Sequence, residues 1–328
     1  MSKLPISFAC GLYDRMLPLY TGDVEAKGVD LNFIALDNPR EIFDRMAGGL
    51  EFDVAEMSGS EFISHTGAGD CPFVALPVFP SRLFRHSYTC YNQKSGIKSP
   101  KDLEGRRVGV PLYTMTAALW VRGHLAHDYD VDLSTIQWVQ GAINKPGAHG
   151  NPSARPLLKP ANIEINDGGK SLDDLLQSGD IDATLGSSLP ASLGKNPDIV
   201  RMFPDFRTVE KGYYQRTKIH PIMHLIAIRR DVHEAHPWLA SSLYQAFCEA
   251  KDRALKSMGY GGALRYMLPW LKADMEEIDE VFGGDPWPYG IEPNRPTLET
   301  MVAYMVEQSY IAEPIALEDL FVPAFGGP

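Results

Sequence analysis

Short apolar runs alternate with polar, helix-like segments along the first part of the chain. The runs at residues 4–10 (LPISFAC), 29–36 (VDLNFIAL), 52–57 (FDVAEM) and 73–79 (FVALPVF) each have the length of a buried strand. Residues 38–49 (NPREIFDRMAGG) place apolar side chains at helical spacing and end in two glycines, which predicts a helix and its C-terminal stop. Strands alternating with helices predict α/β layers around a parallel-rich sheet.

A second unit of the same kind follows. Residues 105–111 (GRRVGVP) predict a short buried strand, and residues 131–141 predict another. Between them, residues 114–129 predict an amphipathic helix that Thr114 or Thr116 can cap.

The remaining segments predict a return to the first unit. Residues 142–162 are rich in proline and glycine, which predicts a surface excursion, and residues 171–188 predict helix, turn and strand. Residues 220–232 form an apolar run that predicts a strand leading into a mainly helical C-terminal part. The expected α/β lobes are therefore residues 1–92 plus 220–328, and the inserted residues 93–219.

Composition and charge narrow the class of protein. The chain has 328 residues, 44% of them hydrophobic, which is enough for the cores of two domains. A net charge of −11 and the lack of a long basic run argue against nucleic acid and against an anionic membrane surface as partners. The four cysteines are scattered without a CxxC pair, and the N-terminal residues lack a signal-peptide pattern, so we expect reduced thiols in a cytoplasmic protein.

One stretch concentrates positive charge against this acidic background. PSRLFRHS (80–87) places Arg82, Arg85 and His86 between two apolar segments, which suits a small anionic ligand better than a polyanion. The alternative is a solvated connection between strands with ordinary surface arginines.

Several motifs resemble known proteins. SPKDLEGRRVGV (99–110) resembles the type 2 periplasmic-binding-protein fold, which implies two α/β lobes with the ligand in the cleft between them. Six further stretches together resemble the 4,5-dihydroxyphthalate decarboxylase family over nearly the whole chain. They are GLYDR (11–15), FDVAEMSGSEF (52–62), PVFPSRLFRHSY (77–88), YTMTAALWVRG (113–123), HPIMH (220–224) and DPWPYGIEPNRPTLET (285–300).

This resemblance implies a cytoplasmic, cofactor-independent carboxy-lyase of aromatic-compound catabolism. Its expected reaction converts 4,5-dihydroxyphthalate to protocatechuate and carbon dioxide, as a step of phthalate degradation. Two alternatives stay open, a non-catalytic binding protein for a small aromatic or pyrimidine-like solute and an enzyme acting on another hydroxybenzoate. The expected partner is a small aromatic carboxylate, and the sequence leaves a homo-oligomer open.

The chemistry of ipso-protonation suggests roles for individual residues. It needs a proton donor beside the ring carbon, cations for two adjacent carboxylates and a dry cleft. We expect His86 to donate the proton, with His220 and His224 as the other candidates, and Glu56 to receive the phenol proton. Arg82 and Arg85 should hold the carboxylates. The other expected substrate contacts are Arg15, Ser58, Ser60, Tyr113, Thr114, Thr116, Ser187 and Ser188.

Structural roles are the alternative at each of these positions. Arg15 can pair with Asp14, and each histidine can be a hydrogen-bonded core residue. No metal is expected, although His86, His220 and His224 together leave a divalent metal site open. The spacing of His124 and His127 suits one edge of a metal site, but an exposed helix face explains it better.

Overall fold

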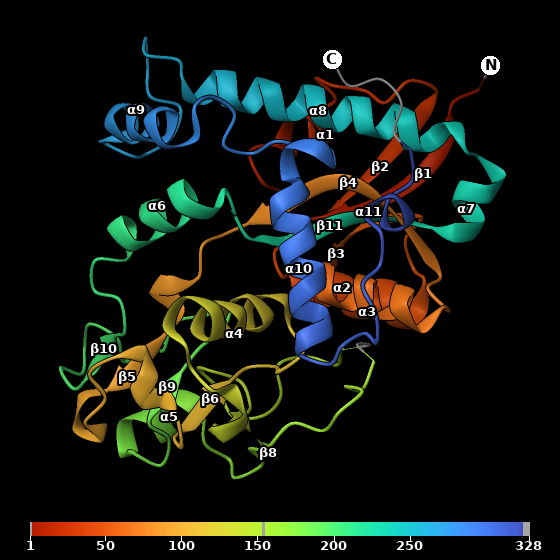
Figure 1. Cartoon of the computed structure of the whole chain (residues 1–328). Coiled ribbons are helices and arrows are strands. Elements are labelled where there is room, and N and C mark those ends of the chain that lie inside the picture. Colours follow the sequence, from red (N-terminus) through yellow and green to blue (C-terminus); the bar gives the residue numbers. More distant parts are fainter. Residues whose placement is uncertain (1, 153–154, 324–328) are drawn as a thin grey trace.

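The computed structural model describes residues 2–152 and 155–323, which form two lobes with a β-sheet in each (Figure 1). The first sheet has the strand order β2-β1-β3-β11-β4, and β11 is its antiparallel strand. Its strands are β1 (Leu4–Cys10), β2 (Val29–Ala35), β3 (Val54–Ser58), β4 (Phe73–Arg82) and β11 (Ile222–Arg229). The helices of this lobe are α1 (Leu17–Tyr20), α2 (Pro39–Gly49), α3 (Gly59–Ala68), α7 (Arg230–Ala235), α8 (Trp238–Met258), α9 (Leu271–Phe282), α10 (Arg295–Glu307) and α11 (Leu317–Leu320).

The second sheet has the order β10-β5-β9-β6-β7-β8, and β5 is its antiparallel strand. Its strands are β5 (Cys90–Asn92), β6 (Arg107–Val110), β7 (Gln137–Gln140), β8 (Ile163–Ile165), β9 (Ala183–Thr184) and β10 (Ile199–Arg201). The helices that follow its strands are α4 (Thr116–Tyr129), α5 (Leu172–Ser178) and α6 (Phe206–Thr217).

The predicted α/β layers and parallel-rich sheets are confirmed, because each sheet has one antiparallel strand among parallel ones. The chain crosses to the second sheet before β5, which begins at Cys90, and returns at β11. The first sheet thus contains segments from both sides of the insertion that the sequence predicts. The residue limits of the domains stay predictions.

The ends of the strands explain why several candidate site residues gather between the lobes. In an open α/β sheet, ligands bind beyond the carboxyl ends of the parallel strands. Strand β3 ends at Ser58, and β9 ends two residues before Gly186. Because β11 is antiparallel to β3, its first residues lie at the same edge, where His224 pairs with Ser58.

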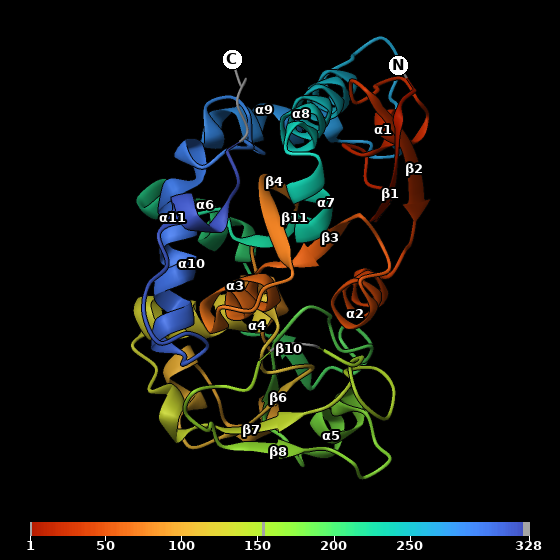
Figure 2. The ribbon, with the colours of Figure 1, turned by 90° about the vertical axis from the view of Figure 1, so that its right-hand side faces the viewer.

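Helix α4 lies between the lobes and packs against α3 and α10, as Figure 2 shows for its position beside α3. All of its residues from Thr116 to Leu125 are buried. Leu119 and Trp120 belong to the core of the first lobe, whereas Ala118 belongs to that of the second. The amphipathic prediction for this helix is therefore wrong, because α4 faces protein on both sides.

The predicted cap of α4 is also wrong. Its N-cap residue is Met115, and no side chain caps the helix. Thr116 is the first helical residue, and its hydroxyl bonds across to the first lobe at Ser58 and Ser60.

The loop at residues 283–290 packs along β4. Trp287 Nε1 donates to the carbonyl of Phe79 at 2.7 Å, and Gly290 N donates to that of Pro77 at 2.8 Å. The loop thus covers part of the first lobe. Among the described residues, no helix is both long and apolar enough to cross a membrane.

Candidate active site

A cavity of about 290 Å³ lies between the two lobes. The first lobe contributes residues from the start of α2, the end of β3, the turn after β4 and the start of β11. The second lobe contributes the first turn of α4, the segment after β9 and one residue of the proline- and glycine-rich excursion. The lining residues are Asn38, Pro39, Arg40, Phe43, Ser58, Arg85, Met115, Thr116, Ala117, His149, Ser187, Ser188, Met223 and His224.

His224 and Glu56 form a hydrogen-bonded pair at one wall of the cavity. The two strands place Ser58 directly opposite His224 and Glu56 one step further along the same face, so the side chains meet diagonally. His224 Nδ1 lies 2.5 Å from Glu56 Oε1, and the ring packs edge-on against Phe43. Because Nδ1 is taken by the carboxylate, Nε2 is the nitrogen left to act on a ligand.

Glu56 has no exposed surface, but three hydrogen-bond donors stabilise its negative charge. The Tyr13 hydroxyl donates to Oε1 at 2.9 Å, and the Gly11 N–H and Cys10 thiol donate to Oε2 at 3.2 and 3.4 Å. Burial raises the pKa of Glu56, but the charge and hydrogen bond of His224, with the Gly11 and Tyr13 donors, hold it below its ordinary value. The stabilisation that this carboxylate contributes is lost as the pH falls through the lowered pKa.

Arg85 is the cation of the site that lacks a carboxylate partner. Its side chain is 6% exposed and lines the cavity. Its Nε donates to the sulfur of Met223 at 3.4 Å, and its guanidinium lies 4.8 Å from the Tyr88 ring centroid. Across residues 2–152 and 155–323, no acidic side chain lies within salt-bridge distance of it. Burial lowers its pKa to about 10, against the opposing effects of Tyr88 and Glu210. A buried, unpaired guanidinium that faces a cavity is suited to bind an anion.

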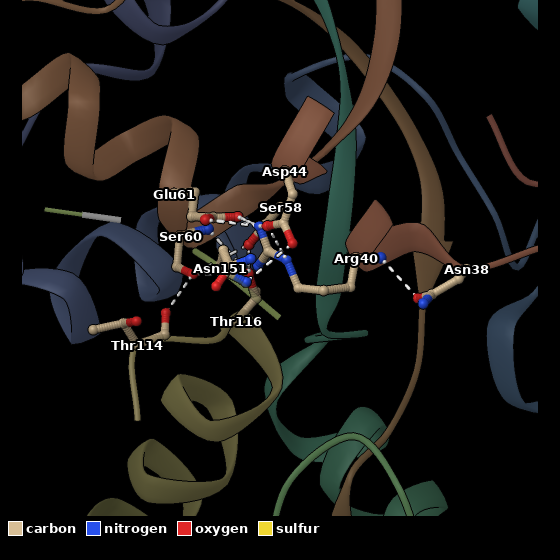
Figure 3. A network of polar contacts seen from close by, with 9 residues as sticks. All are labelled: Asn38, Arg40, Asp44, Ser58, Ser60, Glu61, Thr114, Thr116 and Asn151. Carbon is tan, nitrogen blue, oxygen red and sulfur yellow. Dashed lines mark hydrogen bonds and ion pairs between the residues drawn. The ribbon is translucent and has the colours of Figure 1, made fainter. Parts of the chain in front are cut away.

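Hydroxyl groups join the two lobes at the floor of the site (Figure 3). Thr116 Oγ1 lies 3.0 Å from both Ser58 Oγ and Ser60 Oγ, and it accepts the Ser60 N–H at 3.0 Å. The Ser60 hydroxyl donates to the Thr114 carbonyl at 2.8 Å. The first turns of α3 and α4 therefore meet here, and the positive ends of the two helix dipoles favour a negative charge.

Arg40 is a residue of this site that the sequence analysis missed (Figure 3). It projects from α2 and donates to both carboxylate oxygens of Glu61 at 3.0 Å and to Asp44 at 2.7 Å. Asn151 N of the second lobe also donates to Asp44, at 3.0 Å. One signal in the sequence could have identified Arg40: it follows β2 closely, at the same sheet edge as the end of β3.

His149 is the other missed residue with a titratable side chain. It comes from the excursion, for which the sequence predicted only a surface position. Burial and the charge of Arg40 lower its pKa, against the opposing effect of Asp44. A neutral imidazole therefore lines the cavity wall at this point.

The structure brings together six of the residues expected from the sequence and excludes the others from the cavity lining. Arg85, His224, Ser58, Thr116, Ser187 and Ser188 line the cavity. Ser60 and Thr114 lie behind them in the hydroxyl network, and Glu56 lies behind His224. Tyr113 is buried beneath the Arg122 guanidinium, 3.7 Å from its ring centroid.

Arg82 and Arg85 diverge instead of converging on one point. Arg82 ends β4, and its guanidinium donates to the carbonyls of His220 and Pro288 at 3.0 and 3.3 Å. It is 5% exposed and does not line the cavity. The turn after β4 directs the two side chains to different places, so of the expected pair only Arg85 lines the cavity.

The three candidate histidines also lie in three different places. His86 is buried against His124, with ring centroids 4.8 Å apart, and its Nδ1 lies 3.7 Å from Glu210. His220 lines a separate cavity together with Arg15, which pairs with Asp14 as its structural alternative predicted. The structure therefore offers His224, and not His86, to a ligand between the lobes.

The separate positions of the three histidines also decide whether they could bind a metal together. No group of three or more His, Cys, Asp or Glu side chains within the described ranges is arranged to hold a metal ion. His124 is buried and His127 pairs with Glu307 at 2.7 Å, so these two do not share the exposed face that the spacing suggested.

Comparison with known proteins identifies the family. No family model matches the chain. The 4,5-dihydroxyphthalate decarboxylase of Comamonas testosteroni is 36% identical over 327 residues, which are 99% of this chain and 98% of that protein. The chain belongs to the 4,5-dihydroxyphthalate decarboxylase family.

A second member of the family gives the same result over a shorter alignment. The 4,5-dihydroxyphthalate decarboxylase of Pseudomonas putida is 36% identical over 219 residues, covering 66% of this chain and 83% of that protein. The resemblance stated from the sequence motifs is therefore confirmed for this decarboxylase-family chain.

Solved structures show the fold of this family member. The periplasmic sulfonate-binding protein SsuA of Methylobacillus flagellatus superposes with a TM-score of 0.54 at 12% identity, covering 98% of this chain and 93% of that one. The aliphatic sulphonate-binding protein SsuA of Escherichia coli gives 0.54 at 12% identity, covering 100% and 94%. The expected periplasmic-binding-protein-like fold is confirmed.

Proposed function

We propose that this family member decarboxylates 4,5-dihydroxyphthalate to protocatechuate and carbon dioxide. The observation that carries the proposal is one cavity in which a carboxylate-backed histidine lies with a buried arginine that has no carboxylate partner. The names of the two relatives supply the substrate. The cavity supplies a proton donor and anion sites for it.

The substrate carboxylates have two places to bind. One carboxylate pairs with Arg85 in bidentate geometry, which gives that buried guanidinium the counter-charge it lacks. The other lies at the uncapped first turn of α4, where Thr116 and Ala117 line the cavity. Arg40 already pairs with Asp44 and Glu61, so it adds little net charge and serves to shape the wall.

His224 is the proposed proton donor. Its Nε2–H protonates the ring carbon that bears the departing carboxylate, and a C–H bond forms there. The hydroxyl oxygen para to this carbon delocalises the positive charge. The C–C bond then breaks, its electron pair returns to the ring, carbon dioxide leaves, and solvent restores the proton on His224.

Glu56 positions this histidine and stabilises its charged form. It does not line the cavity, so the expected transfer of the phenol proton to Glu56 has no direct path. Its carboxylate instead fixes the orientation of the ring through Nδ1–H and favours the imidazolium that must donate.

Replacing Glu56 with glutamine tests this role. Glutamine keeps the size of the side chain but removes the charge that favours the imidazolium. We expect kcat to fall roughly 10- to 100-fold and the alkaline loss of turnover to begin at lower pH, as measured by a pH–rate profile. Tyr13→Phe removes one donor to Glu56 but keeps the carboxylate, so its loss should be smaller. An unchanged pH profile for Glu56→Gln contradicts the role.

Direct assay of the full chain tests the function. We expect equal amounts of carbon dioxide and protocatechuate from 4,5-dihydroxyphthalate, and deuterium at the vacated ring carbon when the reaction is run in D₂O. We propose that the reaction needs no metal or organic cofactor, so turnover should persist after dialysis against a chelator. Tight binding of the substrate without turnover favours the alternative of a non-catalytic binding protein.

Cytoplasmic location and a role in phthalate degradation complete the proposal. They rest on the composition of the chain and on the relatives' reaction, and fractionation of the producing cells tests the location.

A further inference from the structure

A second cavity, of about 360 Å³, lies in the first lobe between α8, α9 and the loop at residues 283–290. Its walls are mainly aromatic and aliphatic. The Phe84 and His220 rings stack with centroids 4.7 Å apart and planes 21° apart, and Phe282 and Trp287 each lie 5.5 Å from His220. Methionine and leucine side chains of α8 and α9 complete the lining. Such walls favour a flat ring over a flexible chain.

The charged residues at this cavity argue for an uncharged ligand. Arg15 Nε donates to the Pro80 carbonyl at 2.7 Å, and its guanidinium pairs with Asp14 at 3.0 Å. Lys251 pairs with Asp285 and Asp252. Each cation is thus balanced by a neighbouring carboxylate, which leaves little net attraction for either an anion or a cation. This distinguishes the cavity from the inter-lobe site, where Arg85 has no carboxylate partner.

The same two chain segments line both cavities. Phe84 lines the second cavity, and the next residue, Arg85, lines the inter-lobe cavity. His220 lines the second cavity, and His224 lines the inter-lobe cavity four residues later. Arg82 ties these two segments together through its hydrogen bond to the His220 carbonyl. A displacement of the Phe84–His220 stack should therefore shift Arg85 and His224, the two groups that we propose to bind and protonate the substrate.

We propose that the second cavity is a binding site for an uncharged aromatic compound, and that its occupation changes the affinity of the inter-lobe cavity for its anionic ligand. The binding half stands independently of the decarboxylase proposal. The coupling half rests on that proposal only through the inter-lobe anion site.

Calorimetry with indole tests the binding half on the full chain. We expect indole to bind, and benzoate and benzyltrimethylammonium to bind this cavity at least 10-fold more weakly, since they carry charge. Ala254 lines the cavity, so Ala254→Phe fills it and should weaken indole binding at least 10-fold. Arg253→Phe adds the same ring at the neighbouring, exposed position and should leave indole binding unchanged.

Lack of indole binding, or equal binding to the wild type and Ala254→Phe, overturns the proposal. If Ala254→Phe fails to fold, Met275→Trp fills the cavity from α9 and replaces it.

Titration with phthalate tests the coupling half. Phthalate carries two carboxylates, and its binding can be measured without turnover. We expect saturating indole to change the phthalate dissociation constant at least 5-fold in the wild type and not in Ala254→Phe. An unchanged constant in the wild type overturns the coupling. Failure of phthalate to bind at all counts against the inter-lobe anion site, whereas indole binding is measured directly.

Discussion

Replacing His224 with asparagine should lower kcat for 4,5-dihydroxyphthalate by roughly 10²- to 10⁴-fold, the usual weight of general acid catalysis. The asparagine amide can still donate a hydrogen bond to Glu56, so the buried carboxylate keeps a partner. The substrate carboxylates bind elsewhere in the cavity, and KM should therefore change little. Single-turnover measurement of carbon dioxide release, with KM from initial rates, checks both expectations.

His86→Phe is the matched control for this variant. Phenylalanine preserves the stacking on His124 within the same buried cluster, and His86 does not line the cavity. Near wild-type turnover in His86→Phe together with a large loss in His224→Asn supports His224 as the donor. The reverse result would return the role to His86, where the sequence alone had placed it.

Replacing Arg85 with methionine should raise KM by roughly 10²- to 10³-fold. The loss of a buried charge-assisted pair with a ligand carboxylate costs about 2–5 kcal/mol. Methionine keeps the length of the apolar stem, and Arg85→Lys keeps the charge but loses the bidentate fork. The lysine variant should therefore lie between the wild type and Arg85→Met in initial-rate kinetics.

Thermal unfolding distinguishes this binding role from a structural one. Burial lowers the pKa of Arg85 to about 10, which means that the fold without ligand disfavours its charge. Removal of that charge should leave the melting temperature unchanged or raise it. A melting temperature that falls with an unchanged KM would contradict the proposed role and indicate an anchor of the fold.

The fold was predictable because its signals are local. Each early strand, such as LPISFAC, is a short segment rich in apolar residues, and the helix at NPREIFDRMAGG begins at its own N-cap, Asn38, and ends at Gly49. The burial of α4 on both sides was not predictable in this way. Its pattern depends on two cores that are distant in the sequence.

The part of the site that lies within the family-like motifs was predictable from the sequence. Arg85 and His224 lie in stretches that resemble the family, whereas the choice of His224 over His86 depends on the strand register that brings Glu56 to it. Arg82 and Arg85 are only three residues apart, but the turn after β4 separates their side chains. Arg40 and His149 reach the cavity from separate lobes, so only the tertiary structure reveals them together.

The position of α4 has a consequence for how the molecule loses its structure. Because Leu119 and Trp120 complete one core and Ala118 the other, neither lobe can melt without exposing apolar surface that the other lobe covers. Burial of each large side chain contributes about 1.5–3 kcal/mol. We therefore expect the two lobes to unfold as a single cooperative unit, in spite of their separate sheets.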